Sequence, residues 1–424
     1  MYRSPLFIVD TPEKLQEMVA MLEGEPVIGI DTEADSMYAY QEKVCLVQVS
    51  DRNRDYIIDP LAGFSLDPLA PFMEDPEIVK IFHGADYDVV SMKRDFGFTF
   101  RNLFDTMITA QILGLPRVGL ADLCDRYFGV LMEKKYQTHN WALRPLQPEH
   151  LDYARGDTHY LLALRELFVR KLQRTGRMAI AQEEFALVED REWSLKVPKE
   201  QLFRKMKGAN KLDDKALRAL RGLWDMRDAH AERMNRPPYK VIPNQVLLKL
   251  AEKRPETLEQ LGKHVRAGSS MVRRYGEEMV AAIQSAMETT DELPDVPKKV
   301  RSGTRAKYGS REVERLFNQL KEWRSQVLKR DKVPMILVGS NSQLKAIAGT
   351  RPASLQELGE LEEIRDWQVD IYGEELLELV AAFEAGMPKK RSKSKASSDD
   401  DAPKKRRRRR RRKSGDDAQP AQES

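Results

Sequence analysis

Two pairs of side chains in this sequence have the types and spacing that chemistry with bound metal ions requires. Asp31 and Glu33 lie two residues apart at the polar end of an apolar run, residues 27–30. Because alternate residues of a strand face the same side, both carboxylates would point the same way. Tyr153 and Asp157 lie four residues apart. On a helix, that spacing places the phenol and the carboxylate on one face.

A further carboxylate, Asp88, follows the apolar segment 78–82 and falls in the first turn of an expected helix. Neighbouring carboxylates repel each other unless a cation lies between them. Oxygen ligands without a His or Cys set favour Mg²⁺ or Mn²⁺, and two such ions about 4 Å apart can hold a phosphate. Each acid alone would more often be a solvated surface group, so the prediction depends on their combination.

The elements that must position these residues alternate between strand-like and helix-like patterns over residues 1–175. The apolar runs and their turn residues predict strands at 27–33, 44–50, 55–60 and 78–82, and helices at 87–95, 106–113, 120–128 and 148–170. The short link 51–54 predicts a hairpin between the second and third strands. This order indicates an α/β domain in which a mixed sheet is flanked by helices.

After about residue 200 the strand signal nearly vanishes, and two helical segments repeat each other. Pro255 and Pro352 end matching segments 97 residues apart, and the YGEE sequences at 275–278 and 372–375 have the same offset. A shared offset at separate anchors predicts a duplicated helical domain. Trp224 and Trp323 are 99 residues apart, so pairing them requires a two-residue insertion or deletion.

Composition shifts and charge runs divide the chain into three domains, two linkers and a basic tail. The expected boundaries are 1–175 for the α/β domain, 176–210 for a linker, 211–292 for the first helical domain, 293–308 for a linker, 309–387 for the second helical domain and 388–424 for the tail. The tail holds 15 Lys and Arg against 6 Asp and Glu, whereas the whole chain has a net charge of +4. We expect a disordered arm attracted to phosphate backbones.

Cysteine usage and apolar patterning exclude several classes of protein. The two cysteines, Cys45 and Cys124, form no CxxC pair, so neither a disulfide framework nor a zinc finger is expected. No apolar stretch approaches 18 residues, and residues 1–15 lack the pattern of a secretory signal. We therefore expect a cytoplasmic protein that does not span a membrane, although the arginine block could also be interpreted as a nuclear signal.

The motifs together resemble the tyrosine-type DEDD 3′–5′ exonucleases, and in particular the ribonuclease D family. They are DTE at 31–33, HGADYD at 83–88, YARGD at 153–157 and WALRPL at 141–146. The two helical repeats resemble HRDC domains, which bacterial ribonuclease D carries in tandem. The resemblance implies an RNase H-like exonuclease domain followed by two all-α domains. It covers residues 5–385, and the tail matches nothing.

The resemblance also implies an activity and a role for each motif residue. Asp31, Glu33, Asp88 and Asp157 would hold two divalent ions, Mg²⁺ or Mn²⁺, and Tyr153 would orient the attacking water. The implied reaction removes 3′-terminal nucleotides of RNA as 5′-monophosphates. The implied partners are single-stranded RNA 3′ ends, including those of tRNA precursors, and we expect the protein to be a monomer.

Several side chains outside the acidic set are candidates for substrate contact, namely His83, Lys134, Lys135 and Arg155. Asp105, by contrast, fits a helix N-cap. Two other functions remain open from the sequence. The same fold could degrade DNA, because HRDC domains also occur in helicases, although no GxxxxGK[ST] motif is present. The chain could also be a non-catalytic RNA-binding scaffold that uses the repeats and the tail.

Overall fold

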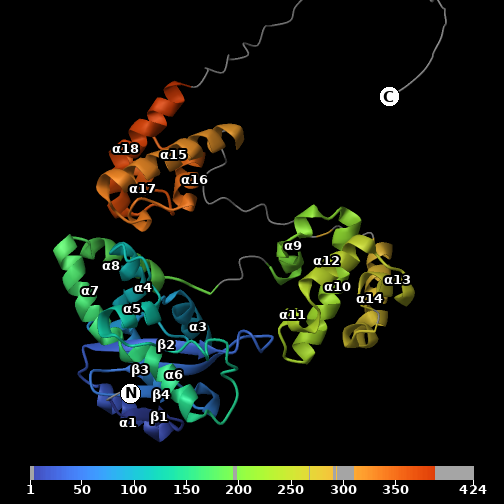
Figure 1. The fold of residues 1–424 in the computed structure, drawn as a ribbon, viewed down its shortest axis with the longest axis horizontal. Helices are drawn as coiled ribbons and strands as arrows, with labels where there is room; N and C mark the ends of the chain where they lie inside the picture. The colour runs from blue at the N-terminus through green and yellow to red at the C-terminus, as the bar shows by residue number, and fades with distance from the viewer. Residues whose placement is uncertain (1–3, 194–197, 267, 290–292, 294–309, 387–424) are drawn as a thin grey trace, which may run out of the picture.

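The computed structural model describes residues 4–193, 198–266, 268–289, 293 and 310–386. It contains one sheet flanked by helices and two further domains built from helices alone (Figure 1). The basic tail predicted at 388–424 lies outside the described residues. Among the residues that are described, no helix is long and apolar enough to cross a membrane.

The six strands form one mixed sheet in the order β1-β4-β3-β2-β5-β6. They are β1 Leu6–Val9, β2 Val27–Ala34, β3 Val44–Ser50, β4 Asp55–Ile58, β5 Val79–Phe82 and β6 Leu103–Asp105. The β2–β3 and β3–β4 pairs are antiparallel, and the β1–β4, β2–β5 and β5–β6 pairs are parallel. The predicted mixed sheet and the hairpin at 51–54 are thus confirmed. The short strands β1 and β6 were not predicted.

The helices of this domain include those predicted, with one of them divided in two, and three that were not predicted, α1, α2 and α8. In chain order, the helices are α1 Pro12–Leu22, α2 Ala70–Glu74, α3 Asp86–Phe96, α4 Thr106–Ile112, α5 Leu120–Phe128, α6 Pro148–His159, α7 Leu161–Thr175 and α8 Met178–Glu189. The prediction of a single helix over 148–170 was wrong, because the helix is interrupted at Tyr160, between α6 and α7. The N–H of Tyr160 bonds to the carbonyl of Thr158, and its ring stacks on Phe128 with the centroids 5.7 Å apart.

Helices α6 and α7 cover the face of the sheet on which the acidic residues lie. The hydroxyls of Ser50 on β3 and Thr158 on α6 are 2.7 Å apart. Gly29 on β2 has room only for a hydrogen there, because a Cβ atom would lie 3.2 Å from the carbonyl oxygen of Thr158. This close approach brings α6 down onto β2, next to the positions of Asp31 and Glu33.

Each helical domain consists of a long first helix, two or three shorter helices and a long last helix. Short α9 Leu202–Lys205 precedes them; the first domain contains α10 Asp214–Arg233, α11 Pro238–Val241, α12 Asn244–Lys253, α13 Leu258–His264 and α14 Ser270–Glu288, and the second contains α15 Ser310–Asp331, α16 Asn341–Thr350, α17 Leu355–Gly359 and α18 Asp366–Ala385. The matching order confirms the predicted duplication.

The proposed pairing of Trp224 with Trp323 was wrong. Arg227 donates to the carbonyl of Ile242 at 3.0 Å and to the Asn244 amide oxygen at 2.6 Å. Arg324 makes the same two bonds, to Gly339 at 2.8 Å and to Asn341 at 2.8 Å. These equivalent residues are all 97 positions apart, so no insertion is needed, and Trp323 takes the place of Met226.

The two helical domains contact the α/β domain differently. The buried apolar residues of the second domain form one continuous cluster with those of the α/β domain. At its edge, Arg365 pairs with Glu184 on α8 at 3.2 Å. The first domain has a separate core, against which Tyr40 from the β2–β3 loop packs (Figure 1). The hydroxyl of Tyr40 donates to Asp228 on α10 at 2.7 Å.

Candidate active site

Strand β2 carries Asp31 and Glu33 on the face covered by α6, as the alternation predicted. Both side chains are half-buried. The pKa of Asp31 lies well above its usual range because of burial and then because of the charges of Asp88, Asp157 and Glu33. Burial, followed by the charges of Asp157 and Asp88, raises the pKa of Glu33 to about 9.

Asp88 comes from a different segment, the first turn of α3. The turn before α3 is held by Asp105, whose carboxylate accepts from the N–H groups of Gly84 at 3.0 Å and Ala85 at 2.8 Å. Asp105 also caps α4, which confirms that prediction. The buried Asp88 carboxylate accepts from the hydroxyl of Thr32 on β2 at 2.5 Å. Burial is the main cause that raises its pKa to about 6.

Asp86, two residues earlier, could be confused with Asp88 in the sequence. In the structure it is more than half exposed and pairs with Arg191 at 2.5 Å. Of these two aspartates, Asp88 is among the carboxylates that raise the pKa of Asp31 and Asp86 is not. Asp88 therefore belongs to the acidic group.

Helix α6 contributes Tyr153 and Asp157 from one face. Burial and the charge of Asp88 raise the pKa of Asp157 to about 7. Burial raises the pKa of the Tyr153 phenol, and the charges of Asp157, Glu33 and Asp31 raise it further, so the hydroxyl keeps its proton at neutral pH. The five side chains predicted from three separate segments therefore lie close enough to influence one another's charge. We call Asp31, Glu33, Asp88 and Asp157 the acidic group.

An aromatic cluster, which sequence reasoning did not predict, packs around Tyr153. The ring of Trp141 lies 5.9 Å from the Tyr153 ring at 30°, and the ring of Tyr136 lies 5.8 Å away, edge on. Trp141 is 1% exposed. The loop that holds it is fixed by Arg144, which donates to Asp59 through Nε and Nη2 at 2.6 Å each. The WALRPL motif thus acts as a support for the tyrosine.

The acidic group has no protein cation beside it in the part of the chain that the structure describes. As placed there, no three His, Cys, Asp or Glu side chains among the described residues have the geometry of a formed metal site. The donor chemistry nevertheless fits a hard divalent cation, because every member is a carboxylate and a cation would relieve the repulsion among them.

The predicted substrate contacts lie in different surroundings. His83 is held by Thr106 at 2.9 Å, and burial lowers its pKa to about 4, so it is neutral. Lys134 is exposed, and the ammonium of Lys135 lies 4.9 Å from the ring centroid of Tyr136, which borders Tyr153.

Arg155 requires a correction. It is buried, and its guanidinium donates to Asp55 at 2.5 and 3.0 Å and to the carbonyl of Ser4 at 2.7 Å. This buried ion pair holds β4 against α6, so the guanidinium acts within the fold and not as the phosphate contact that we predicted. Arg155 follows Ala154 on a buried turn of α6, which its type alone does not reveal.

Comparison with known proteins agrees with the fold. A family model described as a 3′–5′ exonuclease matches residues 6–173, and the HRDC domain model matches residues 216–283 and 313–380. The site and the folds around it thus define a 3′–5′ exonuclease with two HRDC domains.

Individual relatives narrow this class. Ribonuclease D from Gluconacetobacter diazotrophicus is 28% identical over 88% of this chain and 92% of its own length. The crystal structure of the catalytic core of RRP6 from Trypanosoma brucei is 32% identical over 67% of this chain and 80% of that one, with a TM-score of 0.59. The chain therefore belongs to the 3′–5′ exoribonuclease family that contains ribonuclease D and RRP6.

Other relatives of the RRP6 kind are much longer proteins. Exosome complex component 10 from Rattus norvegicus is 32% identical over 75% of this chain, but the match spans only 36% of that protein. The first curated relatives are therefore matched over about a third of their length.

Proposed function

We propose that this protein is a metal-dependent 3′–5′ exoribonuclease that removes terminal nucleotides of RNA as nucleoside 5′-monophosphates. One observation carries the proposal: carboxylates from β2, α3 and α6 meet at one place in the fold, where Asp88 and Asp157 raise the pKa of Asp31 and Glu33, and the charges of Asp157, Glu33 and Asp31 raise that of Tyr153. Such a concentration of uncompensated negative charge is costly unless it serves to hold cations.

Asp31, Glu33, Asp88 and Asp157 would hold two divalent ions, Mg²⁺ or Mn²⁺. Bound there, the ions would supply positive charge to the terminal phosphodiester and make a water easier to deprotonate. Water then attacks phosphorus, the bond to the 3′ oxygen of the shortened RNA breaks, and the terminal nucleotide leaves with a 5′ phosphate. The Thr32 hydroxyl donates to Oδ1 of Asp88, which leaves the other oxygen of that carboxylate for a cation.

Tyr153 would orient the attacking water. Its raised pKa keeps the phenol protonated, so that the hydroxyl can donate one hydrogen bond while it accepts another. The rings of Trp141 and Tyr136 restrict the phenol to one direction. The side chain therefore positions the nucleophile and need not act as a base.

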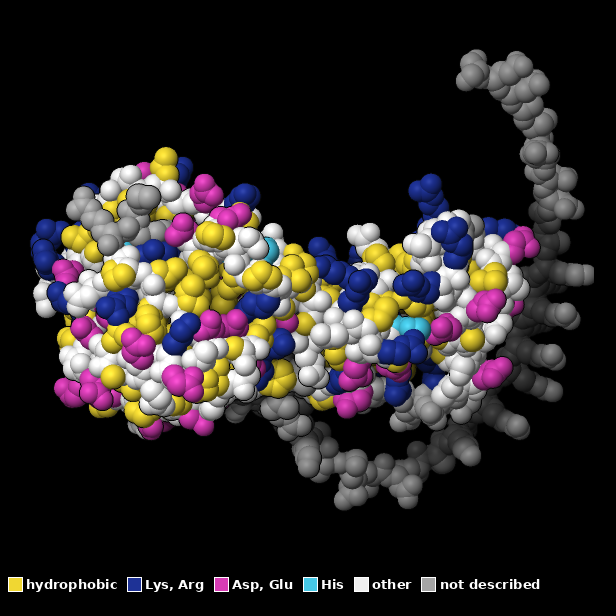
Figure 2. Space-filling view, turned by 90° about the horizontal axis from the view of Figure 1, so that it is seen from below, with side chains coloured by type: hydrophobic (Ala, Val, Ile, Leu, Met, Phe, Trp, Pro, Cys, Tyr) yellow, Lys and Arg dark blue, Asp and Glu magenta, His cyan; other side chains and the backbone are white. Residues whose placement is uncertain are grey.

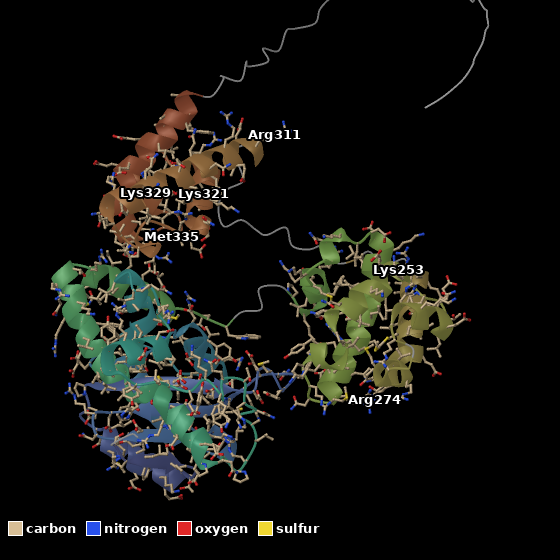
Figure 3. The ribbon with its side chains drawn as sticks, viewed as in Figure 1. Lys253, Arg274, Arg311, Lys321, Lys329 and Met335 are labelled. Carbon is tan, nitrogen blue, oxygen red and sulfur yellow. The ribbon has the colours of Figure 1, made fainter. Side chains whose placement is uncertain are left out.

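The partner that we propose is a single-stranded RNA 3′ end, including the ends of tRNA precursors. The name of the relative ribonuclease D supports RNA as the substrate. Basic side chains gather over the first HRDC domain on the face seen in Figure 2. Lys253 and Arg274 on that domain, and Arg311 and Lys329 on α15, are exposed (Figure 3). His83, Lys134 and Lys135 are proposed contacts nearer the acidic group.

We also propose a monomer that works in the cytoplasm. Both cysteines are buried and free, which fits a reducing compartment.

A matched pair of variants tests the proposal. Asp88→Asn should abolish nucleotide release from an RNA with a single-stranded 3′ tail, whereas Asp86→Asn, at the exposed neighbouring aspartate, should leave it unchanged. EDTA should stop the wild-type enzyme, and Mg²⁺ or Mn²⁺ should restore it. Equal release by the two variants would contradict the assignment of Asp88. Release that persists in EDTA would contradict the metal dependence. No release with or without EDTA would indicate a binding scaffold, and faster release from a matched DNA would indicate a DNA exonuclease.

The basic tail would add long-range attraction to RNA. Deleting residues 388–424 should weaken RNA binding most at low salt and leave the chemical step unchanged, because salt screens such attraction. The test compares the salt dependence of binding by the full chain and by the shortened chain. Equal salt slopes would exclude a role of the tail in RNA binding.

A further inference from the structure

Gln48 on β3 is a buried polar side chain. It is 0% exposed, and neither its amide oxygen nor its amide nitrogen has a hydrogen-bond partner among the residues that the structure describes. Leaving an amide buried without a partner costs about 1–3 kcal/mol, whereas an apolar side chain of the same size would avoid that cost. A glutamine at this position is therefore expected only if the amide has a partner in a state other than the free protein.

The sheet places this amide beside the acidic group. Gln48 is paired with Asp31 in the antiparallel register of β2 and β3, so the two side chains leave the sheet on the same face. Two residues away on that face, Leu46 packs in one cluster with Trp141 and Ala154, and Ser50 contacts Thr158. Gln48 therefore lies under α6, level with Asp31, between the Leu46–Trp141 cluster and the contact of Ser50 with Thr158.

The chemistry of the amide suits this position. A carboxylate that holds a cation still has lone pairs directed away from it, and a donor that binds them fixes the orientation of the carboxylate. An ammonium or guanidinium there would compete with the cation, whereas a neutral amide N–H donates without adding charge. No Lys or Arg in the described residues takes this place beside Asp31.

We propose that Gln48 is a positioning residue for Asp31. When a divalent ion is held by the acidic group, the Gln48 N–H donates to the Asp31 carboxylate, and the amide oxygen accepts from a water at the site. The inference rests on the proposed metal-dependent function, which it deepens. Gln48 does not touch the RNA or the reacting phosphate in this account.

Two measurements with opposite expected signs test the role. Gln48→Met replaces the amide with an apolar chain of similar size. In EDTA, its unfolding temperature should equal or exceed that of wild type, because an unsatisfied buried amide has been removed. In a Mn²⁺ titration followed by the shift in unfolding temperature, the half-saturating concentration should rise about 10- to 100-fold. If Gln48 only filled the core, its replacement would change the unfolding temperature in EDTA without weakening Mn²⁺ binding.

Two further variants keep the test decisive. Val49→Ile changes a buried residue of the same strand on the opposite face of the sheet and should leave the Mn²⁺ titration unchanged. Gln48→Asn keeps a shorter amide and should lie between wild type and Gln48→Met in Mn²⁺ affinity, even if the methionine variant folds poorly. Wild-type Mn²⁺ affinity in both Gln48 variants would overturn the proposal. A wild-type protein that Mn²⁺ does not stabilise would instead contradict the proposed metal-dependent function.

Discussion

The nuclease domain and the HRDC domains bury charge in opposite ways. The acidic group places four carboxylates near one another, and no lysine or arginine of the described part of the chain lies beside them. In each HRDC domain, an arginine on the long first helix donates to a backbone carbonyl and to an asparagine amide oxygen, at equivalent positions in both copies. Each arginine has hydrogen-bond acceptors within its own domain, whereas a cation that would balance the carboxylates must come from outside the protein.

The largest effect on activity is expected when a carboxylate of the acidic group is removed. Asp31→Asn should lower the rate of nucleotide release by about 10³-fold, because the ions lose a charged ligand. The same change should raise the unfolding temperature in EDTA, because an amide takes no part in the repulsion that raises the pKa of Asp31. Release rates and unfolding curves of the purified variant test the expected fall in activity and the expected rise in unfolding temperature. A variant that is both inactive and less stable would show that Asp31 supports the fold.

The buried arginine of the first HRDC domain should show the reverse behaviour. Arg227→Met leaves the Ile242 carbonyl and the Asn244 amide without their donor, and should lower the free energy of unfolding by about 2–3 kcal/mol. The chemical step on a saturating short RNA should not change. Arg324→Met removes the same bonds where the side chain is only half-buried, and should cost about 1 kcal/mol. Urea unfolding monitored separately for the two variants tests this order, and an equal loss would argue against burial as the cause.

These residues also show what sequence patterns can and cannot predict. The acidic group and Tyr153 were predictable because their motifs combine residue types that are rare together at those spacings. Arg227 and Arg324 were not singled out, because an arginine on a helix is ordinarily a surface residue. Gln48 was likewise unremarkable within an apolar strand. In each case the deciding fact is a partner, or a missing partner, from a distant segment, and the local sequence does not contain it.

The prediction for the tryptophans failed for a related reason. Trp224 and Trp323 are conspicuous, so they suggested an alignment of the two repeats. The arginine bonds show that the correct alignment of the two first helices is shifted by two residues from the one that pairs the tryptophans. The continuity between the second HRDC domain and the nuclease core could not be predicted either, because both surfaces look like ordinary amphipathic helices until they are paired.

The stability of the metal-free protein should depend on pH in a direction set by the acidic group. The pKa values of about 6 for Asp88, 7 for Asp157 and 9 for Glu33 lie above those of unfolded carboxyls. Between about pH 4 and 9 the folded state therefore holds more protons than the unfolded state, so its stability falls as the pH rises through these values.

Unfolding temperatures in EDTA should accordingly fall by about 5 °C between pH 6 and pH 9. In Glu33→Gln the fall should be smaller, because one of the raised groups no longer titrates. Saturating Mn²⁺ should reverse the trend, since the ion binds the deprotonated carboxylates. A metal-free unfolding temperature that rises over this range would contradict the mutual repulsion on which the comparison depends.

The smallest effect concerns surface charge, where the two HRDC copies differ from each other. Arg273 and Arg274 are exposed on α14, and the equivalent positions on α18 are the exposed Asp370 and Ile371. If the copies contact RNA through this face, only the first has the charge to do so. Replacing both arginines with alanine should weaken binding of a single-stranded RNA about threefold at low salt. The matched double alanine variant of Asp370 and Ile371 should bind RNA as well as wild type, or slightly more tightly. Equal weakening in the two variants would mean that this face acts through its shape, and that the difference in charge between the copies has no part in RNA binding.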